Sequence, residues 1–410
     1  MTYKFDALII GGGASGLMCA AEAKRQNPKL NIAIIEKNDR VGKKLLATGN
    51  GRCNLTNLRV SADKYTGSYK TGNLFERYDA EFLLRKFKAL GLLTYSDSEG
   101  RVYPVSRQAS SVLDVLRFAC ERNGVEAFCG EQIRSLKREN GGFRIKTAEN
   151  EFLTKKLVIA CGSKAAPKLG GSASGADYLR NLGLAVEPFQ PALCPIQVKS
   201  EVLKSLKGLR AAGRVTLTRN GNAVKSECGE VQFSDGALSG ICVFNLSLYA
   251  KDGDVISVDL LPDYSEKELY NILIKNKELF ANQNADNLFT GILQKRLAQA
   301  VMKQSGVKDF SRLCADLTDN ELRQAAKTVK GMTFGVTQLS GFEQAQCARG
   351  GVKGYEIGDK FESKRVRNLF VCGEAIDICG ECGGYNLHFA WGTGILAGRS
   401  AAENLSEARR

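Results

Sequence analysis

A glycine-rich turn between two apolar segments constrains the fold of this chain more than any other feature. The short apolar run Asp6–Ile10 is followed at once by Gly11-Gly-Gly-Ala-Ser-Gly16, which matches G-x-G-x-x-G. A helical pattern comes next, and a second apolar run ends in Glu36, about 20 residues after Gly16. This order of strand, turn, helix, strand and acid predicts a dinucleotide-binding α/β domain with buried parallel strands.

The three glycines that match this motif have separate physical roles. Gly11 makes the tight turn, Gly13 lets the backbone approach a pyrophosphate, and Gly16 lets the helix pack closely on the strand. The helix N-terminus faces the diphosphate with free N–H groups and a partial positive charge. We expect Glu36 to accept hydrogen bonds from the adenosine ribose hydroxyls, which disfavours NADP at this site.

The segment after Glu36 favours FAD over NAD. Residues 41–54 are basic, rich in glycine, and too irregular to be the next helix of an NAD-binding domain. The segment resembles the loop that follows the second strand in glutathione-reductase-like flavoproteins and runs along the pyrophosphate toward the flavin. Basic side chains in it would offset diphosphate charge, and its backbone amides near 49–51 would face the flavin. The sequence therefore predicts non-covalently bound FAD.

Two later apolar strands agree with this prediction. Residues 157–160 lead into Cys161-Gly162, which resembles a second FAD signature, Ala-Thr-Gly, with Cys161 in place of threonine. Residues 369–372 lead into Gly373-Glu374, which resembles a third signature, Gly-Asp, whose acid binds the ribityl chain. Only one full dinucleotide fingerprint is present, so NAD(P)H, a candidate electron donor, would bind without a Rossmann domain of its own.

A last glycine-rich segment, residues 382–388, opens a helix that runs through Ala397. We expect its N-terminus to point at the flavin pyrimidine, where the helix dipole stabilises negative charge on reduced flavin. The complete set of expected FAD-binding residues is Gly11, Gly13, Ala14, Ser15, Gly16, Glu36, Lys37, Lys44, Asn50, Gly51, Arg52, Cys53, Ala160, Cys161, Gly162, Gly373, Glu374, Gly384, Tyr385, Asn386 and Leu387.

The sequence does not show which side chain is the catalytic acid or base, and four side chains are candidates. Cys379-Gly-Glu-Cys382 is either a dithiol that exchanges electrons with FAD or two small residues in a tight turn. Cys53 either packs or has a thiolate pKa lowered by Arg52. His388 either moves a proton or is structural. As it is the single histidine, and C-x-x-C occurs without a second pair, no metal site is expected.

Several motifs in combination resemble a widespread bacterial flavoprotein family, annotated among NAD(P)/FAD-dependent oxidoreductases and aminoacetone-oxidase-like FAD proteins. The motifs are Gly11–Gly16, Thr48–Asn57, Gly229–Gly240, Gly350-Gly-Val352 with Glu362-Ser-Lys364, Gly373-Glu374 and Gly383–Leu387. The resemblance covers essentially the whole chain, and the family includes a reductase of dehydro-bile acids. His388 stands where many members have Gln, and Ser234-Asp235 replaces the commoner Thr-His.

The resemblance implies an FAD-binding Rossmann-type α/β domain, glutathione-reductase-like, that is interrupted by a β-barrel-like domain and a small helical domain. The residues agree with an interruption. Asn220-Gly221 predicts a hairpin turn, and Ser265-x-x-Glu268 and Thr318-x-x-Glu321 predict capped helices. We expect the FAD-binding domain at 1–190 and 334–410, and a substrate or cap domain at 191–333, helical over about 265–330.

Composition limits the partners and the location. The net charge is +14, but Lys and Arg are spread along the chain without a dense basic run, which disfavours nucleic acid as a partner. The 13 cysteines, with no secretory or membrane-spanning apolar stretch, predict free thiols in a reducing cytoplasm and no membrane association.

The expected function is that of an FAD-dependent oxidoreductase acting on a small molecule. The first hypothesis is an NAD(P)H-driven reductase of an activated alkene or ketone. The second is an amine or amino-ketone oxidase that produces peroxide. The third, prompted by the positive charge, is a flavin-dependent RNA-modifying or RNA-binding protein.

Overall fold

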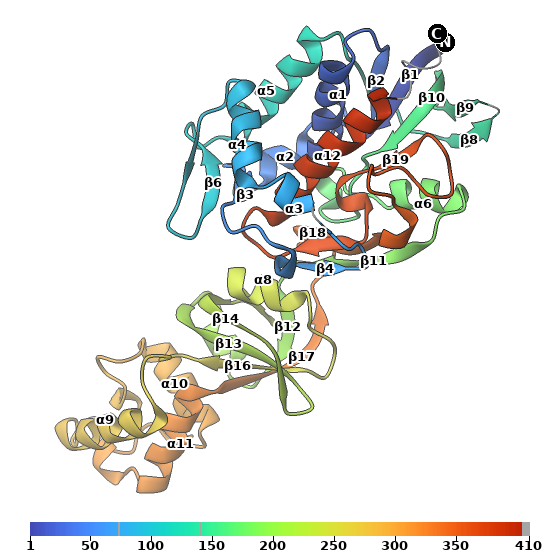
Figure 1. The fold of residues 1–410 in the computed structure, drawn as a ribbon. Coiled ribbons are helices and arrows are strands. Elements are labelled where there is room, and N and C mark those ends of the chain that lie inside the picture. Colours follow the sequence, from blue (N-terminus) through green and yellow to red (C-terminus); the bar gives the residue numbers. More distant parts are fainter. Residues whose placement is uncertain (73, 140, 404–410) are drawn as a thin grey trace. The chain divides into compact units, whose positions relative to one another are not determined.

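The computed structural model describes residues 1–72, 74–139 and 141–403, and the chain divides into two compact units (Figure 1). The first unit comprises Met1–Ala192 and Ala345–Arg410, and the second comprises Leu193–Gln344. Among the described residues, no helix has the length and apolar character needed to cross a membrane.

A seven-stranded sheet forms the centre of the first unit. Its parallel strands are β7 (Glu126–Cys129), β2 (Ile32–Glu36), β1 (Thr2–Ile10), β10 (Glu151–Ile159) and β19 (Leu369–Val371), each paired with the next. The N-terminal half of β10 instead pairs with antiparallel β9 (Gly142–Lys146), which pairs with β8 (Ser135–Glu139). The continuous apolar run at the end of β1, residues 7–10, and the apolar sequence of β2 follow from burial on both faces of a parallel sheet.

Helices α1 (Ala14–Gln26), α5 (Ala109–Arg122) and α12 (Tyr385–Glu403) lie together in the first unit (Figure 1). Two glycines of α12 allow its close approach to α1. A Cβ atom on Gly394 would meet the backbone oxygen of Ser15, and one on Gly398 would meet that of Cys19. The helix that ends the chain's FAD-binding motifs is therefore held directly against the helix that begins them.

Smaller elements surround this core of the first unit. They include a three-stranded sheet β3-β6-β5 and the pairs β11–β18 and β20–β4. Their bounds are α2 (Lys43–Ala47), β3 (Thr56–Asn57), β4 (Tyr65–Gly67), α3 (Leu74–Arg77), α4 (Ala80–Ala89), β5 (Thr94–Ser96), β6 (Arg101–Pro104), α6 (Ser174–Asn181), β11 (Val186–Ala192), β18 (Cys347–Val352) and β20 (Ile378–Gly380).

The second unit is a closed barrel with helices and a hydrophobic core of its own. The barrel order is β12 (Ile196–Lys199), β15 (Ala237–Ser239), β14 (Asn222–Phe233), β13 (Arg210–Arg219), β16 (Val255–Asp259) and β17 (Met332–Leu339). The helices are α7 (Leu203–Leu206), α8 (Ile241–Ser247), α9 (Glu266–Leu279), α10 (Lys295–Gln304) and α11 (Asp319–Lys330).

The interrupted α/β fold predicted from the sequence is confirmed, and so are several local elements. Asn220 and Gly221 both have positive φ angles and join β13 to β14. Ser265 and Thr318 form the predicted capping boxes of α9 and α11. The second unit extends beyond residue 333, because β17 pairs with both β12 and β16 and supplies the strand that closes the barrel.

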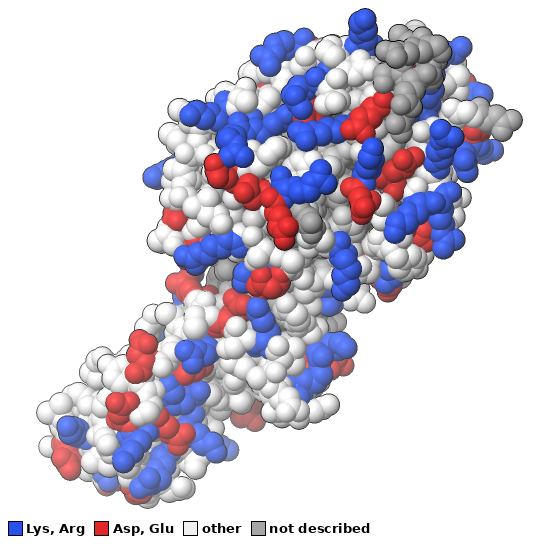
Figure 2. Space-filling view, viewed as in Figure 1, with Lys and Arg blue, Asp and Glu red and all other residues white. Residues whose placement is uncertain are grey.

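Charge is distributed unequally between the two units. The first unit contains 39 Lys and Arg against 27 Asp and Glu, whereas the second contains 19 against 17. The excess positive charge of the chain therefore belongs mainly to the first unit. On the face drawn in Figure 2, basic and acidic side chains are interspersed.

A buried carboxylate ties three helices of the first unit together. Glu22 of α1 has a side chain with no exposed surface, and it accepts hydrogen bonds from Arg25, from Lys86 of α4 and from Arg399 of α12. Burial alone would raise the pKa of Glu22, but the hydrogen bonds from Arg25, Lys86 and Arg399, with the charge of Lys86, outweigh it and lower the pKa to about 2.

Because the pKa of Glu22 falls from 4.5 to about 2 on folding, its ion pairs stabilise the fold above pH 4.5 and lose this effect as the pH falls toward 2. We expect Glu22→Gln to lower the free energy of unfolding at pH 7 by about 3 kcal/mol, because cations lose a buried partner. Urea denaturation at pH 7 and pH 3 measures this, and the difference between variant and parent should shrink at pH 3.

The matched control is Glu81→Gln, which removes the exposed carboxylate paired with Arg85 on α4. Its cost should stay below about 1 kcal/mol, since exposed pairs are screened by solvent. Equal costs for the two variants would contradict the role assigned to Glu22.

Candidate functional site

The carboxyl ends of the parallel strands bring the predicted FAD-binding segments to one edge of the sheet. Ile10 of β1 is paired with Ile35 of β2 and with Ile159 of β10, and Ile159 is paired with Val371 of β19. The chain therefore leaves three neighbouring strands at one level, into Gly11, Ala160 and Cys372. Ligands of open α/β sheets bind outside the carboxyl ends of the strands, so this edge is the candidate site.

The glycines of the first turn are required for different reasons. Gly11 has φ +107° and lies against the backbone of Ala160, so a side chain there would be strained and would collide. A Cβ atom on Gly16 would collide with the backbone oxygen of Gly11. Packing within the protein thus accounts for Gly11 and Gly16.

Gly13 differs, because no contact within the protein requires a glycine there. Its φ is −83°, which any residue adopts, and a Cβ atom would find nothing within 4 Å. The open space lies at the N-cap of α1, where no side chain caps the helix and the first amides have no partner within the helix. This arrangement fits a pyrophosphate that approaches the backbone and accepts those hydrogen bonds.

Glu36 is held at the adenosine end of this turn. Its Oε2 accepts a hydrogen bond from Gly12 N–H at 2.8 Å, and its Oε1 accepts one from Asn38 N–H at 2.8 Å. Gly42 N–H donates to Gly12 O at 2.8 Å, which joins the loop after β2 to the glycine-rich turn. This loop includes the short helix α2, where the sequence predicted irregular backbone. Lys37 is half-buried beside the carboxylate.

Glu374 follows β19 and contacts Lys44 of α2 and Ser163, which lies after β10. Its Oε2 lies 2.7 Å from Lys44 Nζ and accepts a hydrogen bond from Ser163 Oγ at 3.0 Å. Gly162, after β10, has φ +69°, and a Cβ atom there would lie 4.0 Å from the same carboxylate oxygen. The structure therefore brings Lys44, Gly162 and Glu374 together.

The loop over residues 48–54 contains four consecutive or near-consecutive residues with positive φ: Gly49, Asn50, Gly51 and Cys53. Asn50, Gly51 and Arg52 are exposed, whereas Cys53 is fully buried. Asn54 adds a residue that was not among the predicted binders: its Oδ1 is buried without a hydrogen-bond partner. A buried acceptor of this kind fits a donor on a cofactor, such as a flavin imide or ribityl hydroxyl. Its position within the motif Thr48–Asn57 was the available signal.

The N-terminus of α12 is fixed by backbone contacts. Gly384 has φ +100°, and a Cβ atom there would meet the backbone oxygen of Thr56. Tyr65 Oη donates to Tyr385 O at 2.8 Å. The Asn386 side chain accepts from Gly380 N–H at 2.8 Å and donates to Gly380 O at 2.9 Å, so it holds β20 to the helix. Leu387 is half-buried. The first turn of α12 is therefore a rigid element whose amides point outward.

His388 is a buried link between three segments. Only 1% of its surface is exposed, its Nε2–H donates to Tyr78 O at 2.8 Å, and its Nδ1 accepts from Thr56 Oγ1 at 2.6 Å. Burial lowers its pKa to about 4, against opposing effects of the hydrogen bond to Tyr78 and the charge of Asp79. With both ring nitrogens engaged, the neutral imidazole supports the structural alternative.

Two cysteines of the predicted site are protonated at neutral pH. Burial raises the pKa of Cys53 to about 12, although a hydrogen bond with Thr48 opposes the shift. Arg52 does not lower it, since its guanidinium instead lies 5.1 Å from the ring centroid of Tyr103. Burial likewise raises the pKa of Cys161 to about 12, and its Sγ contacts Ile10 O at 3.5 Å. Both thiols therefore pack rather than act as thiolates.

The two cysteines of the C-x-x-C motif have different surroundings. Cys379 is buried, and its Sγ lies 2.6 Å from Sγ of Cys347 on β18. Cys382 is half-buried, with its Sγ 3.9 Å from Gln346 Oε1. The sulfur that neighbours Cys379 therefore belongs to Cys347, a residue outside the C-x-x-C motif.

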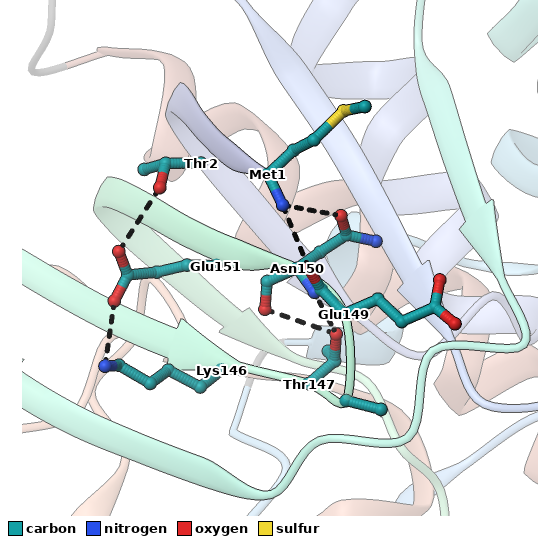
Figure 3. Close-up of a pocket in the computed structure, with 8 residues that line it drawn as sticks. Met1, Thr2, Lys146, Thr147, Glu149, Asn150 and Glu151 are labelled. Atoms are coloured by element: carbon teal, nitrogen blue, oxygen red, sulfur yellow. Dashed lines mark hydrogen bonds and ion pairs between the residues drawn. The ribbon is translucent and has the colours of Figure 1, made fainter.

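Figure 3 shows a separate pocket of about 300 Å³, lined by Met1, Thr2 and residues 146–151. It lies where β1 begins and where β9 turns into β10. This is the amino-terminal end of β1, opposite to the end that leads into Gly11. The pocket is therefore separate from the candidate FAD site.

Comparisons with known proteins agree with the geometry. The family model described as the HI0933-like protein Rossmann domain matches residues 5–400. The chain is 33% identical over 404 residues to the 3-dehydro-bile acid delta(4,6)-reductase of Clostridium scindens, covering 96% of this chain and 98% of that protein. It is 28% identical over 400 residues to the ribosomal RNA dihydrouridine synthase of Escherichia coli, covering 95% and 96%.

Among solved structures, the 3-ketosteroid-delta4-(5alpha)-dehydrogenase of Rhodococcus jostii, in complex with 4-androstene-3,17-dione, matches with a TM-score of 0.51. The match covers 98% of this chain and 97% of that one at 14% sequence identity. At this identity the likeness concerns the fold.

The open space at Gly13 gives a sharp test of the cofactor site. We expect Gly13→Ala to fold like the parent, because the added methyl meets no protein atom, but to bind FAD at least about tenfold more weakly, because it occupies the pyrophosphate position. Titration of apoprotein with FAD, followed by flavin fluorescence, measures the affinity, and urea denaturation measures stability.

Gly335→Ala, in strand β17 of the second unit, is the matched control. Its Cβ atom would lie 4.0 Å from the nearest protein atom. It should leave both FAD affinity and stability unchanged. Unaltered FAD affinity in Gly13→Ala would contradict the placement of the FAD pyrophosphate at this turn.

His388 should contribute to stability through its neutral form. Because its folded pKa is depressed from 6.5 to about 4, the contribution is complete above pH 6.5 and is lost as the pH falls through 4. We expect His388→Ala to lower the free energy of unfolding at pH 7 by about 2 kcal/mol, because Tyr78 O and Thr56 Oγ1 lose a buried partner.

Urea denaturation at pH 7 and pH 4 measures this contribution. The cost of His388→Ala should shrink at pH 4, and His388→Gln, which keeps a donor and an acceptor, should cost less than His388→Ala. A cost for His388→Ala that grows toward pH 4 would mean that the protonated form is the stabilising one.

Proposed function

This chain belongs to the HI0933-like family of FAD-dependent oxidoreductases, and from that premise we propose that it reduces a carbon–carbon double bond conjugated to a carbonyl group, with NAD(P)H as electron donor. The observation that carries the cofactor assignment is the convergence of Gly11–Gly16, Gly162 and Gly373-Glu374 at one edge of the sheet. The choice of substrate class rests on the chemistry shared by its relatives.

The residues of the chain bind and orient the cofactor. Gly13 and the first amides of α1 would hold the pyrophosphate, and Glu36 would hold the adenosine ribose. Lys44 and Glu374 would contact the ribityl region, with Lys44 offsetting diphosphate charge. When bound, the flavin supplies hydride transfer to and from a second substrate. The N-terminus of α12 would stabilise negative charge on the flavin pyrimidine through its amides and dipole.

Two relatives with different substrates have names that describe the same type of reaction. A delta(4,6)-reductase of a 3-dehydro bile acid saturates a carbon–carbon double bond in a ring that carries a ketone. A dihydrouridine synthase saturates the double bond of a uracil ring, which is conjugated to a carbonyl. In either type of bond, conjugation lets the carbonyl oxygen take up the negative charge when hydride adds to the carbon remote from the carbonyl. We therefore assign this chain the same bond type, as an activated alkene.

The buried side chains of the site do not supply the proton for this reaction. His388 is neutral and has both nitrogens engaged, while Cys53 and Cys161 hold their protons because burial raises the pKa of each to about 12. Among these candidates none is placed to donate a proton at neutral pH. We infer that the protonation of the product relies on solvent or on a group of the substrate itself.

A second candidate substrate is RNA, which one structural observation favours. Arg52 lies over the ring of Tyr103 at 5.1 Å, Tyr103 stacks with Tyr95 at 5.8 Å, and Arg107 lies over Tyr95 at 5.5 Å. Both arginines are exposed, and the loop that carries Arg52 is bound to the start of α5 through Ala109 N–H and Gly51 O. Two exposed arginines that flank a stacked pair of aromatic rings suit contacts with bases and phosphates, and the first unit carries most of the excess positive charge.

Anaerobic spectroscopy of the FAD-loaded protein tests the proposal. We expect NADH or NADPH to bleach the visible flavin bands. We then expect 4-androstene-3,17-dione, which contains a conjugated enone, to restore them, because it accepts the hydride. A saturated 3-ketosteroid of the same size is the control and should leave the flavin reduced.

The other possible outcomes of this experiment distinguish between the alternative functions. Flavin that stays oxidised with both pyridine nucleotides, but is bleached by an amine, would replace this proposal with an amine oxidase. RNA would be assigned as the substrate if a uridine-containing RNA reoxidises the flavin and enones do not. That reoxidation should be lost in Arg52→Ala and at high salt. The expected cytoplasmic location stays a prediction.

A further inference from the structure

A pair of buried sulfur atoms lies beside the candidate FAD site and has no part in the proposed reaction. Cys347 begins β18 and Cys379 lies in β20, and their Sγ atoms are 2.6 Å apart. Their exposed fractions are 2% and 1%. The two residues are distant in the sequence, so the fold alone brings them together.

The backbone around the two sulfurs is held close by independent contacts. Asp377 Oδ1 accepts a hydrogen bond from Gly350 N–H at 3.1 Å, and Asp377 N–H donates to Val352 O at 2.9 Å. A Cβ atom on Gly351 would collide with the backbone of Ala375. The segments that carry Cys347 and Cys379 are therefore fixed against each other, and linking the two sulfurs requires little rearrangement of either strand.

The pair also lies next to the residues expected to bind the flavin. Cys347 is close enough to Glu374 and Lys44 for their charges to influence its titration. Cys379 precedes Gly380, whose N–H and O are both bound by Asn386 at the start of α12. The two sulfurs thus lie between the residues assigned to the ribityl chain and those assigned to the flavin pyrimidine.

We propose that Cys347 and Cys379 form a redox-modification site that closes into a reversible disulfide, with a peroxide as the oxidant. One thiol attacks the peroxide oxygen, which yields a sulfenic acid and water. The second thiol then attacks that sulfur, which forms the S–S bond and releases a second water. The two sulfurs together lose two electrons and two protons, and the peroxide is reduced to two waters. A dithiol reductant reverses the change.

The burial of the pair determines which peroxide reaches it. Burial, with the adjacent Cys379 sulfur, raises the pKa of Cys347 well above the ordinary value of a thiol, so little thiolate is present at neutral pH. Peroxide in bulk solvent therefore reacts slowly. A bound FAD, reduced in the presence of oxygen and without substrate, would supply hydrogen peroxide close to the pair. The pair is thus placed to respond to turnover without substrate.

Closure of the disulfide would link two strands beside the predicted FAD site. It would join β18, which contains Gly350 and Gly351, to β20, which ends three residues before Gly383. A covalent link between these strands restricts the unfolded chain and should raise resistance to unfolding. The oxidised protein is therefore expected to have a higher urea midpoint than the reduced protein, and the difference should vanish after treatment with dithiothreitol.

Disulfide mapping of the FAD-loaded protein tests the proposal without depending on catalysis. The protein is treated with excess hydrogen peroxide over a time course long enough for the slow reaction of buried thiols to finish. It is then denatured in acid, alkylated and digested, and the cross-linked peptides are identified by mass. We expect a peptide pair joined through Cys347 and Cys379, which disappears after dithiothreitol. Because all 13 cysteines are free in the reduced structure, any other pairing is recognisable in the same digest.

Two variants test which cysteines the disulfide requires. Cys382→Ser removes the half-buried second cysteine of the C-x-x-C motif and should leave the Cys347–Cys379 peptide and the peroxide-dependent urea shift intact. Cys347→Ser should lose both. A Cys379–Cys382 disulfide in the parent protein, or peroxide treatment that leaves Cys347 and Cys379 as alkylated thiols, would overturn the proposal. The mapping of the parent protein gives this answer even if Cys347→Ser fails to fold.

Discussion

The register of β1, β10 and β19 is the constraint on which the rest of the site depends. Parallel strands in adjacent positions end at one level, and each pair is about 4.8 Å apart. Three turns that are far apart in the sequence therefore meet within the length of a dinucleotide. A shift of one residue in β10 would turn its buried apolar side chains to the opposite face of the sheet and move Gly162 away from Glu374. The hydrophobic pattern of the strands thus fixes the geometry of the polar site.

The same constraint explains how the chain tolerates a long interruption. Between β10 and β19 the chain forms a second unit with its own closed barrel and its own apolar core. Because Leu193–Gln344 is folded on its own contacts, β19 needs only to return to the free side of β10. The antiparallel pair β11–β18 joins the segment before the interruption to the segment after it. Local pairing in the first unit therefore brings the interrupted halves together.

Much of this could be predicted from the sequence because the signals are local. The turn Gly11–Gly16, the hairpin at Asn220-Gly221 and the capping boxes each depend on residues near in sequence, and each is confirmed. The Glu22 network, the partners of His388 and the sulfur contact of Cys347 depend on residues brought together by the fold. Nothing in the spacing of a motif indicates such contacts. The C-x-x-C motif illustrates this limit, because the sulfur in contact with Cys379 belongs to Cys347, which lies outside the motif.

Burial decides what the polar groups of this site can do. The low dielectric that keeps His388 neutral also keeps Cys53 protonated, so neither group changes charge at neutral pH. Glu36 and Glu374 are the site's acids, and each is already held by hydrogen bonds, from Gly12 and from Ser163 respectively. Fixed acids and neutral bases suit a protein that positions a cofactor and leaves bond-making to it. Under the proposed function, selectivity among conjugated alkenes would arise from how a substrate is held, because His388 and Cys53 do not change charge at neutral pH.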